Sequence, residues 1–142
     1  MKITILAVGK IKEKFYRQAI EEFEKRLSRY CKLEIIEVAD EKTPDHASSA
    51  EEFQIKEKEG QRLLKYVRED AWLCALAIEG DALDSVGFSK KIEGLGVSGV
   101  SHLMFAVGGS LGLAESVMER ADYALSFSKM TFPHQLMRVI LL

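Results

Sequence analysis

The stretch "FAVGGSLGL", Phe105–Leu113, decides how the rest of this sequence is interpreted. It carries an apolar, strand-like run into a pair of glycines. Residues Gly108–Gly112 fit the G-x-S-x-G pattern of a serine nucleophile on a sharp strand-to-helix turn. The same glycines also suit a loop on which a small molecule rests, because glycine lets a backbone approach other atoms closely. The two interpretations lead to different chemistry, and the segments around the loop separate them.

The chain alternates between strand and helix patterns. Short apolar runs, several of them rich in β-branched residues, predict strands over Lys2–Val8, Lys32–Val38, Ala71–Ile78, His102–Val107 and Tyr123–Phe127. Helical spacing and capping residues predict helices over about 14–30, 50–67, 88–95, 114–121 and 133–142. This order predicts an α/β fold, a parallel sheet flanked by helices on both faces. Ligands of such sheets bind beyond the carboxyl ends of the strands, where the glycine loop lies.

Apolar periodicity also predicts which helix faces point inward. In the first helix the apolar positions recur every four residues and predict an inward face of Phe15, Ala19, Phe23 and Leu27. In the second helix the residues expected to face the core are Phe53, Leu63, Leu64 and Val67. Ser48 or Ser49 is expected to cap this second helix, and Gly60 to mark a close approach to a neighbour.

Size and composition indicate one domain. The 142 residues, 47% hydrophobic and 30% charged, suit a single globular unit over 1–142. The apolar runs are far shorter than the ~20 residues that span a bilayer. The first residues alternate like a strand rather than a signal peptide, so we expect a cytoplasmic protein with no membrane contact. A net charge of −2 argues against bulk attraction to nucleic acid, so an RNA partner would need a local basic patch.

Metal binding and disulfide formation are not expected. The histidines His46, His102 and His134 are far apart in the sequence and lack Cys or His neighbours at ligand spacing. Cys31 and Cys74 lie in or beside apolar segments, which suits packed, reduced thiols.

The serine hydrolase interpretation has support in the chain order, since Asp122 and His134 follow Ser110 as in an α/β-hydrolase triad. Such enzymes ordinarily need a larger sheet, and no HGGG-type oxyanion segment occurs. Two nucleotide motifs fit less well. The first strand continues into "VGKIKEK" rather than G-x-G-x-x-G, and no G-K-[ST] closes a P-loop.

A second segment favours the ligand-loop interpretation. The connection and helix start "LSFSKMTFPHQLMR", Leu125–Arg138, are polar at several positions and end in Pro-His before an apolar helix. A connection of this kind offers backbone N–H and C=O groups that can grip a flat heterocycle.

These two segments, preceded by "CALAIEG", carry a family resemblance. The combined run "GGxxG…LSxSxMTxPHQLxR" is highly specific, and with "ILAVGKIKEKF" the match covers nearly the whole chain. The sequence closely resembles the bacterial methyltransferases that modify N3 of a pseudouridine in 23S ribosomal RNA, a small family within the SPOUT superfamily.

The resemblance implies a fold, a cofactor and an assembly. It implies a deep C-terminal trefoil knot, a homodimer, and an S-adenosylmethionine pocket built from the knot loops. Ser110 is then part of a ligand loop and not a nucleophile. Carried over residue by residue, the implied cofactor contacts are Leu76, Gly108, Phe127, Ser128, Lys129, Met130, Thr131 and Phe132.

The resemblance leaves the reacting groups open. Relatives continue the last helix into a short basic, aromatic tail with a Tyr-His pair near the reacting base, and we expect this tail to be missing after Leu142, so no catalytic residue is carried over. A non-catalytic ribosome-binding module therefore stays an alternative, beside the serine hydrolase. The apolar last helix predicts a two-fold dimer packed through Met137, Ile140 and Leu141. The basic residues expected to contact 23S rRNA are Lys10, Lys12, Lys14, Arg17, Lys129 and Arg138.

Overall fold

The computed structural model describes residues 1–142 as ten alternating elements around one parallel sheet. The five strands lie in the order β2-β1-β4-β3-β5. Their bounds are β1 Lys2–Val8, β2 Lys32–Val38, β3 Trp72–Ala82, β4 His102–Val107 and β5 Tyr123–Ser126. The helices are α1 Lys14–Leu27, α2 Ser49–Leu64, α3 Ser85–Val97, α4 Glu115–Arg120 and α5 His134–Leu141. The predicted α/β architecture is confirmed.

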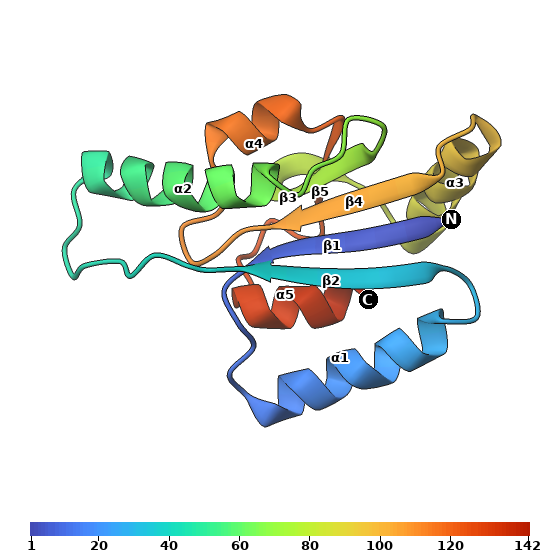
Figure 1. Cartoon of the computed structure of the whole chain (residues 1–142), viewed down its shortest axis with the longest axis horizontal. Coiled ribbons are helices and arrows are strands. Elements are labelled where there is room, and N and C mark those ends of the chain that lie inside the picture. The colour runs from blue at the N-terminus through green and yellow to red at the C-terminus, as the bar shows by residue number, and fades with distance from the viewer.

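Helices cover both faces of the sheet. Figure 1 shows α2 and α4 over one face and α1 and α5 over the other. Alternate residues of β1 divide between these faces: Leu6 and Val8 pack with Leu63 and Val117 beneath α2 and α4, while Ile5 belongs to the core beneath α5. Burial of both faces explains why the strands are continuous apolar runs.

One serine and one glycine fix α2. Ser48 caps the helix through a capping box, in which its hydroxyl accepts from the N–H of Glu51 (3.2 Å) and the Glu51 carboxylate accepts from the N–H of Ser48 (3.3 Å). A Cβ on Gly60 would lie 2.9 Å from the Cβ of Ala114, so this glycine permits the close approach of α2 to α4. Both predictions are confirmed.

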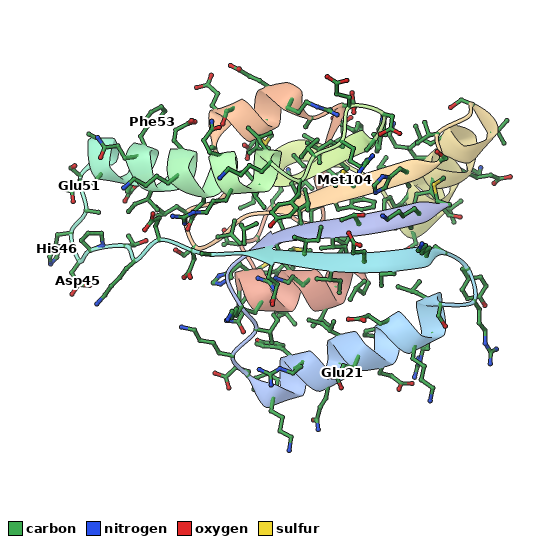
Figure 2. The ribbon with its side chains drawn as sticks, viewed as in Figure 1. Glu21, Asp45, His46, Glu51, Phe53 and Met104 are labelled. Atoms are coloured by element: carbon green, nitrogen blue, oxygen red, sulfur yellow. The ribbon has the colours of Figure 1, made fainter.

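Two predicted core positions are wrong. Phe15 is 61% exposed and Phe53 is 54% exposed. Figure 1 shows that α1 begins at its end farthest from the sheet, and that the first turns of α2 extend beyond the carboxyl ends of the strands. Figure 2 shows Phe53 on the outer side of α2. Spacing identifies a face of a helix, whereas the extent of the sheet decides which turns of that face are covered.

The strand β3 is longer than predicted because it contains an irregular segment. Leu76 and Asp81 both lie opposite Leu125 of β5, so residues 77–80 leave the ladder as a bulge. A Cβ on Gly80 would lie 2.7 Å from the carbonyl carbon of Ala124, and glycine is therefore required where β3 returns to β5. The bulge projects at the carboxyl end of the sheet.

Candidate functional site

One cavity of about 710 Å³ lies at the carboxyl ends of β3, β4 and β5. Three segments form most of its wall: the bulge within β3, the glycine loop after β4, and the segment between β5 and α5. Among the residues implied as cofactor contacts, those that line the cavity are Leu76, Gly108, Phe127, Ser128, Met130, Thr131 and Phe132. Lys129 is exposed and lies outside the lining. The residues implied by the resemblance thus come mainly from two of these segments, the glycine loop and the segment after β5, together with Leu76 of β3.

The glycine loop is folded tightly on itself. Gly109 and Gly112 form an antiparallel bridge, and Gly112 has a φ of +89°. A Cβ on Gly108 would lie 2.6 Å from the carbonyl carbon of Gly112. The sequence suggests that Gly108 has no side chain so that a ligand can approach its backbone. In the structure, the space that a Cβ would fill is already taken by the backbone of Gly112. Glycine is needed here to close the turn itself.

Side-chain hydrogen bonds hold the segment after β5 in place. The hydroxyl of buried Ser126 donates to the carbonyl of Ser128 (3.0 Å), and the hydroxyl of Ser128 accepts from the N–H of Met130 (2.9 Å). Phe127 packs edge-to-face on Phe88 of α3, with ring centroids 6.3 Å apart. These contacts order the loop without a ligand, which lowers the entropy cost of binding one.

Sequence reasoning missed part of the lining. Ala77, Ile78 and Glu79 come from the β3 bulge, while Lys56 and Met118 reach the cavity from α2 and α4. Gly80 after the buried strand was the available signal for the bulge. The helix residues carry no local signal, because only the tertiary fold brings them to the cavity.

His134 is the first residue of α5 and lines the same cavity. Burial lowers the pKa of its imidazole, and the positive charges of Arg138 and Lys12 lower it further, while Asp40 opposes them. The imidazole is therefore biased toward its neutral form, which can accept a proton.

Arg138 does not occupy the surface position expected of an RNA contact. Its side chain is 2% exposed, and the structure corrects the prediction. One guanidinium nitrogen donates to the Glu37 carboxylate (2.6 Å), and the other donates to the carbonyls of Val8 (2.8 Å) and Gly9 (2.6 Å). Burial lowers the pKa of Arg138, and Glu37 counteracts that effect. The residue acts inside the fold, where it fixes α5 against the carboxyl ends of β1 and β2.

The structure excludes the serine hydrolase alternative. Ser110 and His134 line the cavity at the carboxyl ends of the strands. Asp122 lies just before β5, at the opposite end of the sheet, where its carboxylate accepts from the N–H of Leu73 (2.9 Å) and from Arg120 (3.3 Å). Because Asp122 cannot orient His134 from there, no triad forms.

No group of three or more His, Cys, Asp or Glu side chains is placed to hold a metal ion, and His46 lies at the outer tip of the connection between β2 and α2 (Figure 2). No helix is both long and apolar enough to cross a bilayer.

Cys74 is buried, whereas Cys31 is only half-buried, and both are free thiols. Met137 and Leu141, expected at a subunit interface, pack on the core of their own chain, and Ile140 is 40% exposed.

The fold and the cavity define a small α/β protein with a cavity at the carboxyl end of a parallel sheet, the position where ligands of such sheets bind. Comparison with known proteins shows its family. A family model described as "Predicted SPOUT methyltransferase" matches residues 1–142, and the chain belongs to this family.

Proteins similar over the full chain carry one shared description. A protein of Bifidobacterium adolescentis is 63% identical, one of Bifidobacterium animalis subsp. lactis 61% and one of Clostridium kluyveri 58%, each over 142 residues. Each alignment covers 100% of this chain and 89% of the relative. All three relatives are described as ribosomal RNA large subunit methyltransferase H.

Proposed function

We propose that this chain is an S-adenosylmethionine-dependent methyltransferase that methylates N3 of a pseudouridine in 23S rRNA of the large ribosomal subunit. The observation that carries the proposal is the full-length identity of 58–63% to proteins described as large-subunit rRNA methyltransferases. The alignments cover the whole chain, and with it each segment that lines the cavity. The cytoplasm, where ribosomes are found, is the location that fits this substrate.

The lining and the volume of the cavity support S-adenosylmethionine as its ligand. Its apolar lining includes Leu76, Leu125 and Phe132, and the backbone of the segment after β5 supplies polar groups. A volume of about 710 Å³ is within the range of cofactor sites. The implied contacts from Leu76, Gly108 and residues 127–132 belong to this proposal, and of these only Lys129 does not line the cavity.

The bound cofactor would supply an electrophilic methyl group on a sulfonium. Transfer needs the attacking nitrogen in line with that methyl group, so positioning by the loops accounts for much of the rate. The N3 proton must also be removed. His134 is a neutral, cavity-lining group able to accept it, although no base is assigned by the resemblance.

A homodimer and a knotted C-terminal segment complete the proposal. The exposed Ile140 on α5 supports an interface on this helix, while Met137 and Leu141 would contribute through their partly exposed edges. Sedimentation at micromolar concentration tests the dimer, and a stable monomer would contradict it. The knot is tested by a crystal structure in which the path of residues 102–142 is traced.

Calorimetry with S-adenosylmethionine tests the function directly. We expect one site per chain, and a Leu76→Glu variant should lose binding, because it places an unpaired charge in the apolar wall. A Lys25→Glu variant, which changes an exposed residue of α1, is the matched control. Absence of binding by the folded wild-type chain contradicts an enzymatic role and favours the ribosome-binding module.

Methyl transfer is then measured with radiolabelled cofactor on purified ribosomes and on free 23S rRNA. The modified nucleotide is located by mass spectrometry of rRNA fragments. A methyl group found on a nucleotide other than pseudouridine would overturn the substrate assignment while leaving the methyltransferase assignment intact.

A further inference from the structure

The segment around the start of α1 forms a basic surface on an otherwise slightly acidic protein. From Gly9 to Gln18 there are four basic residues, Lys10, Lys12, Lys14 and Arg17, and one acidic residue, Glu13, whereas the whole chain has a net charge of −2. The three lysines are exposed, and none of them forms an ion pair. Their charge is available to a partner.

An aromatic side chain stands in the middle of this surface. Phe15 is 61% exposed, and its ring contacts Tyr16 with centroids 4.3 Å apart and planes inclined at 52°. The contact with Tyr16 restricts the ring without covering it. Proteins bind single-stranded nucleic acids through aromatic rings that stack on the bases and cations that bind the phosphates. The exposed Phe15 among unpaired lysines combines both features.

The basic surface lies beside the cavity. The N–H of Lys12 donates to the side-chain oxygen of Gln135 (3.4 Å), next to the cavity-lining His134. The buried Arg138 bonds the carbonyl of Gly9 (2.6 Å) and so ties the start of the same connection to α5. Figure 1 shows α1 and α5 beginning on the same side of the molecule, where β1 ends. A nucleotide in the cavity would therefore have its chain neighbours near Phe15.

We propose that Phe15 is a stacking platform for an unpaired base near the target nucleotide of a single-stranded RNA loop, and that Lys10, Lys12 and Lys14 bind the flanking phosphates. The inference rests on the proposed function and extends it, since it assigns the RNA a surface outside the cofactor cavity. Stacking requires an unpaired base, so the platform selects loops over duplexes.

The chain offers a matched control for Phe15. Phe53 has nearly the same exposure, 54%, but lies on α2, on the other face of the sheet, beside Glu51 and Glu52. Figure 2 shows Phe53 and Glu51 at the outer end of α2. Its acidic surroundings repel phosphate, so Phe53 should not contribute to RNA binding.

The test measures fluorescence anisotropy with a fluorescein-labelled RNA hairpin that has an unpaired loop containing pseudouridine, and with a blunt duplex of the same length. Wild type should prefer the hairpin. Phe15→Ala should weaken hairpin binding roughly 5- to 150-fold, the range expected for loss of one base stack, while duplex binding changes little. Phe15→Trp should restore the affinity, and Phe53→Ala should bind like wild type.

The lysines are tested by salt dependence. Each of Lys12→Gln and Lys14→Gln should lower the slope of log affinity against log salt by about 0.7, the value for one phosphate contact to a single strand. Circular dichroism and S-adenosylmethionine calorimetry on each variant verify that the fold and the cavity are intact.

The outcomes separate this inference from the proposed function. Unchanged hairpin affinity in Phe15→Ala, with cofactor and RNA binding intact in wild type, overturns the platform and leaves the methyltransferase assignment standing. A wild-type chain that binds cofactor but no RNA also overturns the platform. If Phe15→Ala instead converts a dimer to a monomer in sedimentation, the surface serves a second copy of the chain, and the inference is wrong.

Discussion

Arg138 of α5 and Glu37 of β2, separated by 101 residues in the sequence, form an ion pair of 2.6 Å. The arginine side chain is 2% exposed and the glutamate side chain 35% exposed, so the pair reaches from the interior to the edge of the sheet. The same guanidinium donates to the carbonyl of Val8, the last residue of β1, and to the carbonyl of Gly9, and its Nε has no partner. Arg138 is therefore the polar connection that holds the last helix, and with it one side of the cavity.

Replacing Arg138 by Met should lower the free energy of unfolding by about 1–3 kcal/mol, because it takes a donor from the buried carbonyls of Val8 and Gly9 and leaves Glu37 without its partner. Urea denaturation measures the loss. Arg26→Met is the matched control, since Arg26 pairs with Glu22 at 3.1 Å on the exposed side of α1 and should cost less than about 1 kcal/mol. Equal losses in the two variants would contradict the structural role of Arg138.

A methyl group on Gly108 tests the tight glycine loop. Gly108→Ala should destabilise the protein by about 1–3 kcal/mol, since its Cβ would lie 2.6 Å from backbone that cannot move freely. Affinity for S-adenosylmethionine should fall as well, because the loop lines the cavity. Gly94→Ala in α3 has no atom within 4 Å of the added Cβ and should instead stabilise by up to about 1 kcal/mol. Thermal denaturation measures the stability of both variants, and calorimetry measures their affinity for S-adenosylmethionine. Equal stability of the two variants would contradict the tight packing at Gly108.

The sequence predicted the sheet better than the site. The bounds of β1, β2 and β4 match the prediction, because each strand is a short apolar run bounded by residues that favour turns or loops. The run of β3 also indicated a strand, but not the bulge at residues 77–80, since a bulge is defined by the pairing partner across the ladder. Local pattern therefore predicts a strand and not its irregularities.

Arg138 shows why the site was predicted only in part. On an apolar helix an arginine suggests a surface charge, and its burial depends on acceptors that β1 and β2 provide more than 100 residues earlier. No pattern within the helix encodes those partners. The segment between β5 and α5 was easier, because its polar residues and the glycine loop lie directly after strands whose carboxyl ends share one edge of the sheet.

Glu59 predicts a dependence of stability on pH. This residue of α2 is 5% exposed, and burial raises the pKa of its carboxyl above the ordinary value of 4.5, with Asp40 adding to the effect. The folded state thus holds the proton to higher pH than the unfolded chain. The stability that this proton contributes is complete below pH 4.5 and is lost as pH rises through the folded-state pKa.

Glu59→Gln removes that loss, since an amide stays neutral and its oxygen can still accept from the N–H of Glu41, as the carboxylate does at 3.0 Å. The variant should be more stable than wild type at pH 7–8, and the difference should shrink as pH falls toward the ordinary carboxyl pKa. Thermal midpoints at a series of pH values measure it. If the difference in thermal midpoint between Glu59→Gln and wild type grew on acidification, the pKa of Glu59 would not be raised in the folded state.

The rate at which a thiol reagent labels Cys74 reports how often the sheet beneath the cavity opens. Cys74 lies on β3 two residues before Leu76, is 1% exposed, and burial raises its pKa to about 12. At pH 8 only ~10⁻⁴ of such a thiol is thiolate, the reactive form. In a Cys31→Ser background, a thiol reagent should therefore label Cys74 only when the sheet opens. The half-buried Cys31, in a Cys74→Ser background, should react faster.

S-adenosylmethionine should slow the labelling of Cys74 further. A ligand that binds only the folded state at 100 times its Kd stabilises it by ~2.7 kcal/mol, so the open state becomes about 100-fold rarer and labelling slows by the same factor. S-adenosylhomocysteine, which lacks the methyl group but keeps the rest of the molecule, should protect as well, whereas methionine alone should not. Labelling of Cys74 that is fast and indifferent to these ligands would mean that β3 is not closed beneath the cavity, or that the cavity is not where the cofactor binds.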